Sequence, residues 1–505
     1  MKKYLAMAGL LFLSFSCSDL LKEDPKASLT TEGFYKTVND LDMATTGLYN
    51  LIGITFNQTA GFASTFGGDD MTATRDGNKA DWSDFDTFRA SSSNNLLNFW
   101  WSTFYNTIKS SNNLLLNYTN ATDATEVQLN NTAGQAYFLR GMSYFFLTRV
   151  WGEIPLVTDP SIDYATKKSS VEDIYAQIIS DLQKAETLLP DTWKDDSKRY
   201  QNGVNIAPTS GSAKAMLANV YLTMAGWPLK QTDKYALAAA KAKEVIDSKA
   251  TYGYSLVDIN ILWKKENNFS SETVYGIYYN TNIAEFVYPN TNMMLLAYSP
   301  SDEGAWGDGY GELNFYKNFP NGPRKDATYQ MVYYPGNDTT KAVDYSKTTY
   351  KHPYFQKYRD DAAFNPVNHV TSNWVGSHTV PIIRYAEVLL TYAEAKAMSA
   401  GVDATAYDAI NEVRTRAGLK DLTAGLSQGA FRDSVVAERG WEFAGCEPAS
   451  RWFDLQRTET VAKANSNRDA SEQKLVGTPD DVTHAFYWAP IPINDQLLNG
   501  NLVEQ

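Results

Sequence analysis

The chain has 505 residues, of which 43% are hydrophobic, and a net charge of −13. This negative charge argues against nucleic acid as a partner, because phosphates are bound by Lys and Arg. The length suggests about three domains. The chain has only two cysteines, Cys17 and Cys446, so a modified Cys17 would leave no intramolecular disulfide.

The N-terminal residues 1–16 have the features of a bacterial lipoprotein signal peptide. Two lysines precede a short apolar run over 4–15, which is too short to cross a bilayer. We therefore expect cleavage before Cys17 and a lipid on that residue, which would anchor the protein to a membrane. A typical lipobox has Leu three residues before the cysteine, where this chain has Ser14, so an ordinary secretory signal stays open as the alternative.

Helical periodicity dominates about 30–250 and 381–460. Apolar side chains recur there at spacings of three and four, which is the pattern of one face of an α-helix. Two pairs of these segments, rich in small residues, resemble tetratricopeptide hairpins, in which Ala lets two helices approach closely. The predicted helices are 30–54, 99–116, 135–150, 171–189 (ended by Pro190), 213–224, 235–246, 385–393 and 407–416.

Two long segments, 56–96 and 252–380, interrupt this periodicity. Both are rich in residues typical of loops, and the second also has many Tyr and Trp. Loops of this length in a compact protein usually carry function or form a lobe of their own. We therefore predict an all-α fold, a tetratricopeptide-like helical-repeat scaffold with a loop-rich irregular lobe at about 252–380 packed on it.

A set of motifs in the helical part occurs in a characteristic order. The motifs are Arg140–Phe145, Trp151–Leu156, Arg384–Ala395, Ala409–Gly418, Glu438–Arg439 and Arg451–Leu455. Together with the lipoprotein start, this order resembles the SusD/RagB family of nutrient-binding outer-membrane lipoproteins of Bacteroidetes, over essentially the whole chain. One departure is a slightly longer stretch between Phe443 and Arg451, which indicates a remodelled loop.

The resemblance implies a surface that captures an oligosaccharide and delivers it to a TonB-dependent transporter of the SusC type, over which the lipoprotein acts as a lid. It implies a place on the outside of the cell outer membrane, through the lipid on Cys17. Residues 1–16 would be the signal peptide and 17–505 one glycan-binding domain. Some relatives resemble peptide binders, so a peptide ligand stays open. A surface glycoside hydrolase and a pure protein-interaction scaffold also stay open.

The sequence shows no catalytic or cofactor motif. Its four histidines have no metal-ligand spacing, and no nucleophile elbow or phosphate-binding loop is present. A glycosidase needs two opposed carboxylates, but 58 acidic residues give no selective indication of such a pair. We therefore predict a protein that is not an enzyme and has no cofactor. Calcium at Asp302, Glu303 and Asp308 stays open, although their spacing matches no known calcium loop.

A sugar site needs flat aromatic faces for the pyranose ring and planar polar groups for its hydroxyls. Both irregular segments supply these groups, and in the family ligand contacts commonly come from these two regions. Because Trp82 and Trp306 lie among Asp, Asn and Gly, we interpret them as exposed platforms, with loop packing as the alternative. The predicted ligand-binding residues are Asp69, Asp70, Arg75, Asn78, Asp81, Trp82, Tyr298, Trp306, Asp308 and Tyr310.

Glu438 and Glu442 lie four residues apart on one predicted helix face. Like charges at this spacing repel each other unless cations lie between them. We therefore predict a structural ion-pair network here rather than a catalytic pair of carboxylates. The candidate partners are Arg384, Arg439 and Arg451, with Asp454 as a further acceptor.

Overall fold

The computed structural model describes residues 33–57, 67–161, 163–196, 198–279, 297–338, 340–357, 359, 378–445, 447–448 and 450–503. In these ranges helices dominate and the strands form only two-stranded pairs, which confirms the predicted all-α class. Within the same ranges, no helix has both the length and the apolar character needed to cross a bilayer. Cys17 and Cys446 lie outside the described residues, so lipidation of Cys17 stays a prediction.

The scaffold contains the long helices of the chain. The first group is α2 (Val38–Phe56), α4 (Asn95–Asn117), α5 (Glu126–Trp151), α6 (Val171–Leu188), α7 (Ser210–Ala225) and α8 (Lys234–Asp247). The second group is α14 (Tyr385–Ala400), α15 (Ala404–Arg416), α16 (Gln428–Glu442), α17 (Ser450–Arg457) and α18 (Val461–Asn465). Short helices are α3 (Ala80–Asp86), α9 (Lys249–Tyr252), α10 (Ile259–Leu262), α12 (Leu313–Asn318), α13 (Pro323–Thr328) and α19 (Ile493–Leu498).

Two helix starts differ from the prediction. Helix α2 begins at Val38 because Thr37 and Asp40 form a reciprocal capping box, which fixes the start several residues later than predicted. Helix α5 begins at Glu126, well before the predicted residue 135, and Thr125 caps it in the same way. Its first residues are exposed, so burial periodicity could not reveal them. The predicted stop before Pro190 is confirmed, since α6 ends at Leu188.

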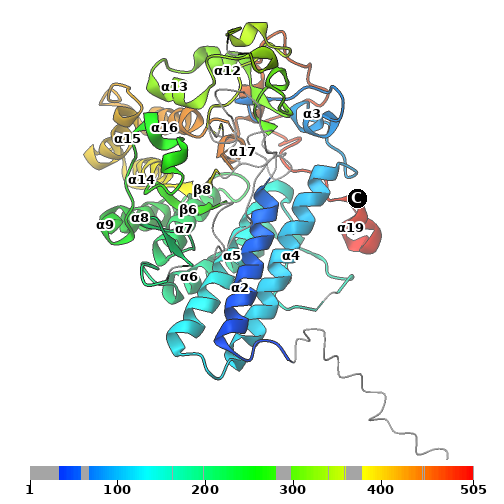
Figure 1. Ribbon diagram of the computed structural model, residues 1–505, viewed down its shortest axis with the longest axis vertical. Coiled ribbons are helices and arrows are strands. Elements are labelled where there is room, and N and C mark those ends of the chain that lie inside the picture. The colour runs from blue at the N-terminus through cyan, green and yellow to red at the C-terminus, as the bar shows by residue number, and fades with distance from the viewer. Residues whose placement is uncertain are drawn as a thin grey trace, which may run out of the picture.

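Neighbouring helices pack in chain order, from α4 on α5 through α6 and α7 to α8, and α14 then packs on α8, α15 and α16 (Figure 1). Small residues allow close approach: a Cβ added to Gly141 of α5 would lie only 3.2 Å from Leu182 of α6. Arg140 of α5 also donates two hydrogen bonds, of 2.8 and 2.7 Å, to the Asp181 carboxylate of α6. The scaffold is therefore a continuous stack of helical hairpins, as the alanine-rich pattern predicted.

The loop-rich lobe is tied to the scaffold by short antiparallel strand pairs. Strand β6 (Thr273–Ile277) pairs with β8 (Val380–Arg384), which leads directly into α14. Strand β1 (Met71–Thr72) pairs with β7 (Tyr310–Gly311) and so joins the two irregular segments. The remaining pairs are β2 (Ile154–Pro155) with β3 (Lys168–Ser169) and β4 (Tyr200–Gln201) with β5 (Val204–Asn205).

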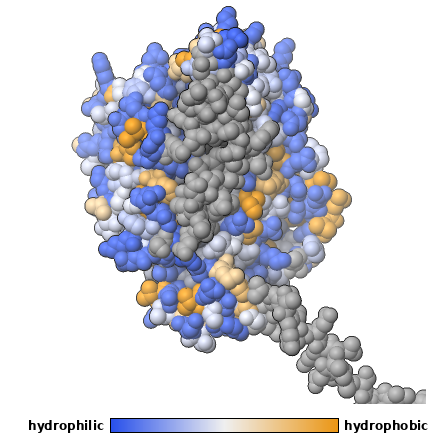
Figure 2. All heavy atoms as spheres, viewed as in Figure 1, coloured by the Kyte–Doolittle hydropathy of each residue, from blue (hydrophilic) through white to orange (hydrophobic). Residues whose placement is uncertain are grey.

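Scaffold and lobe share one hydrophobic core. The ring of Phe138 on α5 lies 4.8 Å from that of Tyr275 on β6, and Tyr298 and Phe355 of the lobe belong to the same buried cluster. Helices α12 and α13 lie at the end of the molecule opposite the lower ends of α2 and α4 (Figure 1). On the face drawn in Figure 2, hydrophilic residues predominate and hydrophobic ones are scattered.

Candidate functional site

The structure brings together the two segments that were predicted to bind ligand. The β1–β7 pairing places Met71 opposite Gly311 and Thr72 opposite Tyr310. Next to it, the Lys79 ammonium forms an ion pair with the Asp308 carboxylate, and both side chains are buried. Residues far apart in the sequence therefore form one seam at the junction of lobe and scaffold.

Three of the predicted ligand-binding residues have solvent-accessible side chains at this seam. Arg75 is exposed and forms a 2.6 Å ion pair with Asp84. Asn78 is exposed, and Asp81 is half-buried and accepts a 3.0 Å hydrogen bond from the Asn95 amide. Their role in ligand binding stays a prediction.

Four further predicted residues, Asp70, Tyr298, Asp308 and Tyr310, are buried, with 4%, 1%, 2% and 4% of their surface exposed. Tyr310 stacks on Tyr350 with ring centroids 5.4 Å apart and belongs to a buried cluster with Tyr333 and Tyr354. These side chains are part of the packing, and their role in ligand binding stays a prediction. A polar, glycine-rich segment gives no local indication of such burial, since the covering residues come from elsewhere in the chain.

Trp82 and Trp306 are not fully exposed platforms. Both are half-buried and pack against the main hydrophobic core. The Lys79 ammonium lies 5.7 Å from the ring of Trp82, within the range of a cation–π contact. The interpretation of these indoles as surface platforms was therefore wrong in part, and the ligand contact of their exposed edges stays a prediction.

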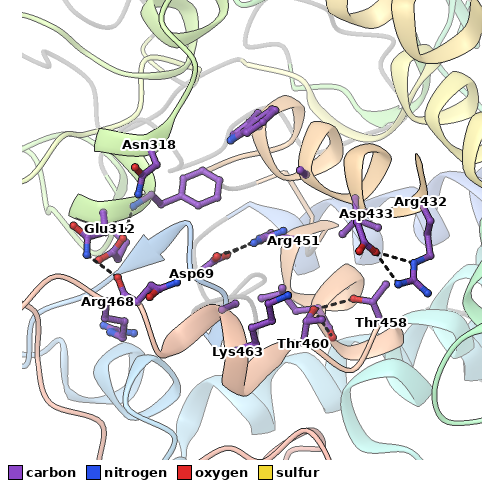
Figure 3. Close-up of a pocket in the computed structure, with 18 residues that line it drawn as sticks. Asp69, Glu312, Asn318, Arg432, Asp433, Arg451, Thr458, Thr460, Lys463 and Arg468 are labelled. Carbon is purple, nitrogen blue, oxygen red and sulfur yellow. Dashed lines mark hydrogen bonds and ion pairs between the residues drawn. The ribbon is translucent and has the colours of Figure 1, made fainter. Parts of the chain in front are cut away.

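A cavity of about 440 Å³ lies between α12, α16, α17 and α18 (Figure 3). Asp69 is the one predicted residue that lines it. Phe315 from α12 and Trp441 from α16 contribute half-buried aromatic side chains. The polar lining includes Asp69, Glu312, Asn318, Arg432, Asp433, Arg451, Lys463, Asn467 and Arg468.

The sequence pattern did not lead to this cavity, although α16 carried an indication of it. Phe431, Val435, Glu438 and Glu442 are buried at the spacing of one helix face. Trp441 falls at the edge of that face, where a side chain can pack against the core on one side and keep the other side accessible. The remaining lining residues come from several helices and a loop, and no local pattern joins them.

The charged groups of the cavity are mostly paired. Arg451 donates two hydrogen bonds, of 2.5 and 2.7 Å, to the Asp69 carboxylate. Figure 3 shows these two side chains pointing toward each other in the wall of the cavity. Arg432 and Asp433 are adjacent on α16 and pair at 2.7 Å. Burial raises the pKa of Glu312 above its usual value, although the backbone N–H groups of Asp469 and Phe315 donate to its carboxylate.

The opposite face of α16 carries the predicted ion-pair network. Glu438 pairs with Arg324 at 2.6 Å and with Arg414 at 2.8 Å. Glu442 pairs with three arginines: Arg384 at 2.7 Å, Arg416 at 2.5 Å and Arg324 at 3.1 Å. Burial opposes the charge on Glu442, but these cations outweigh it and hold its pKa well below its usual range. The structural role predicted for Glu438 and Glu442 is confirmed.

The partners within this network differ in part from the prediction. Arg384 is a central member, as predicted, and Arg439 pairs with Asp454 at 2.7 Å. Arg451 instead pairs with Asp69 at the cavity. The other partners are Arg324, Arg414 and Arg416. Their segments approach α16 only in the folded chain, so the sequence could not identify them.

Two carboxylates that were considered as calcium ligands already accept hydrogen bonds or form ion pairs within the protein. Asp302 accepts from the Thr349 backbone N–H at 3.0 Å, and Glu303 pairs with Arg359 at 2.9 Å. Within the described part of the chain, no group of three or more His, Cys, Asp or Glu side chains is arranged to hold a metal ion. The calcium hypothesis therefore has no ligand cluster among these residues.

The model of the SusD family matches residues 70–505, which is most of the chain. The chain belongs to the SusD family. It is 28% identical over 545 aligned residues to the SusD-like protein P2 of Formosa agariphila, covering 100% of this chain and 99% of that protein.

Solved structures of the family share the fold. The SusD homolog of Bacteroides thetaiotaomicron superposes with a TM-score of 0.77 at 21% identity, covering 93% of this chain and 97% of the other. A laminarin-binding SusD-like protein superposes with a TM-score of 0.71 at 22% identity, covering 92% and 98%. The arrangement of scaffold and lobe is therefore the SusD fold.

Proposed function

We propose that this protein captures oligosaccharides at the outer surface of the outer membrane and delivers them, uncleaved, to a TonB-dependent transporter of the SusC type. The observation that carries the proposal is the SusD-family match over residues 70–505. A fold relative that is named for binding laminarin supports a glycan as the ligand class.

The test of ligand class is a glycan panel applied to the purified mature protein. Binding is measured by calorimetry, and the incubated glycans are then analysed by chromatography. We expect saturable binding of at least one oligosaccharide and no new product. Release of shorter sugars by homogeneous protein would restore the glycosidase hypothesis, and binding of peptides without any glycan would favour the peptide hypothesis.

The proposed anchor is a lipid on Cys17. The variant Cys17→Ala should leave the protein unlipidated, either soluble in the periplasm or retained with its signal peptide. Mass spectrometry of the mature wild-type N-terminus is the measurement. A mature chain that begins at any other residue, or begins at Cys17 without a lipid, would contradict the anchor.

The proposed transporter partner needs a large matched surface, which a helical-repeat scaffold provides. We expect a TonB-dependent barrel to copurify with the protein in mild detergent. Migration of the protein as a lone monomer, with the barrel eluting separately, would count against delivery by direct contact.

A further inference from the structure

The cavity between α12, α16, α17 and α18 has the size of a small-ligand site. Its volume of about 440 Å³ lies in the range of roughly 300–1,000 Å³ that is usual for such sites. Phe315 and Trp441 line it from two different helices, and both are half-buried, so each keeps part of its ring accessible. A partly accessible indole held by a helix is a rigid flat surface for the apolar face of a pyranose ring.

Several polar groups at the cavity are free to bind a ligand. Among the described residues, four lining side chains have no hydrogen-bond or ion-pair partner: the amides of Asn318 and Asn467, the ammonium of Lys463 and the indole N–H of Trp441. An amide both donates and accepts, which matches the two roles of a sugar hydroxyl. Figure 3 shows Asn318 and Lys463 on different sides of the cavity, so they could contact different hydroxyls of one ligand.

The paired charges of the wall favour a neutral ligand. Asp69 with Arg451, and Asp433 with Arg432, already form ion pairs across short distances. A strongly anionic polymer would find only the Lys463 ammonium unpaired among these described groups, and the protein as a whole carries −13. Neutral hydroxyls can add hydrogen bonds to paired charges without breaking them, because a carboxylate has about four acceptor positions.

We propose that this cavity is an oligosaccharide-binding site that holds a neutral pyranose unit against Trp441, with Asn318, Asn467 and Lys463 as hydroxyl partners. This assignment rests on the proposed glycan-binding function. It places a binding site at a cavity that neither Trp82 nor Trp306 lines.

The experiment compares Trp441→Ala with two control variants on the glycan panel, starting with laminarin oligosaccharides as the probe. Trp488→Ala removes an indole that is 39% exposed on a different part of the surface, so it controls for general loss of an exposed tryptophan. Trp82→Ala tests the seam. We expect Trp441→Ala to weaken binding by about ten- to a hundred-fold, and Trp488→Ala to bind as the wild type does.

A second variant keeps the test valid if Trp441→Ala unfolds. Asn318 is exposed, and no hydrogen bond of its side chain is described, so Asn318→Ala should leave the melting temperature unchanged while weakening the binding several-fold. Wild-type affinity in both Trp441→Ala and Asn318→Ala, with a glycan still bound, would overturn the cavity assignment and leave the proposed function intact. Absence of any glycan binding by the wild type would overturn both the cavity assignment and the proposed function. If the wild type bound a peptide and Trp441→Ala lost that peptide while still binding glycan, the assignment of a sugar to this cavity would be wrong.

Discussion

Helix α16 carries charged side chains on two faces that differ in their surroundings. On the inner face, Glu438 and Glu442 are nearly inaccessible and contact arginines from several segments. On the outer face, Arg432 and Asp433 pair with each other at the open cavity. A buried charge that loses its partner costs several kcal/mol, whereas an exposed pair contributes about 1 kcal/mol or less. Similar residue types therefore stabilise the fold on one face and remain available to a ligand on the other.

The largest expected effect comes from breaking the inner network. Arg384→Met would leave the carboxylates of Glu272, Glu442 and Glu447 without their shared guanidinium. We expect the free energy of unfolding to fall by about 3–5 kcal/mol, measured by urea denaturation.

The matched control is Arg432→Met on the outer face, where we expect a loss of about 1 kcal/mol or less. If the two variants lost equal stability, the distinction between the two faces of α16 would be wrong.

Asp70 is a buried carboxylate that contrasts with Glu442, because among the described residues it has no ion-pair partner of its own. Its carboxylate accepts a 3.0 Å hydrogen bond from Gly445 N–H, while Arg451 pairs with Asp69. Burial raises the pKa of Asp70 from 3.8 to about 6, the opposite of the shift at Glu442. A buried acid surrounded by arginines keeps its charge, and one without them tends to take up a proton.

The raised pKa makes a prediction for Asp70→Asn. Because the folded pKa exceeds the unfolded one, the folded state binds the extra proton, and the stability that this proton gives is complete below about pH 4 and lost as the pH rises to about 6. At pH 7.5 the variant should therefore be more stable than the wild type by up to about 3 kcal/mol. The stability difference should shrink toward pH 4; a difference that does not change with pH would show that Asp70 does not titrate in this range.

Trp82→Ala and Trp306→Ala test whether the two tryptophans of the seam serve the packing of the fold or the binding of a glycan. Both indoles are half-buried on the core, so we expect each substitution to lower the free energy of unfolding by about 2 kcal/mol, roughly half the loss for a fully buried tryptophan. Thermal melting and glycan affinity are measured on the same samples. An unchanged melting temperature would restore the interpretation of these residues as surface platforms.

The smallest effect is expected at the wall of the cavity. Asp69→Asn removes the negative partner of Arg451, whose side chain is 14% exposed. We expect a loss of about 1 kcal/mol in stability and a shift of ligand preference toward acidic sugars, measured by comparing neutral and uronic acid-containing oligosaccharides. No change in this preference would indicate that the Arg451 guanidinium does not reach the ligand.

The sequence alone was sufficient for most of the long helices and for the family, although it did not give the bounds of α16 or the exact starts of α2 and α5. The periodicity at 213–224 and 235–246 depends on contacts within one or two turns, so it predicted α7 and α8 well. The ordered motifs are likewise a linear property of the chain. The pair Glu438 and Glu442 could also be interpreted correctly, because the repulsion of like charges on one helix face is a local effect.

Only the tertiary structure decided which aromatic side chains remain accessible. Tyr310 is buried in a cluster with Tyr333 and Tyr354, which lie more than twenty residues further along the chain. The cavity is assembled from Asp69, Phe315, Trp441 and Lys463, which belong to four separate segments. Local composition determines what a segment of the backbone can form, whereas the burial of a side chain depends on distant segments that pack against it. The sequence therefore specified the scaffold, and the packing of lobe against scaffold specified the surface at which a ligand could bind.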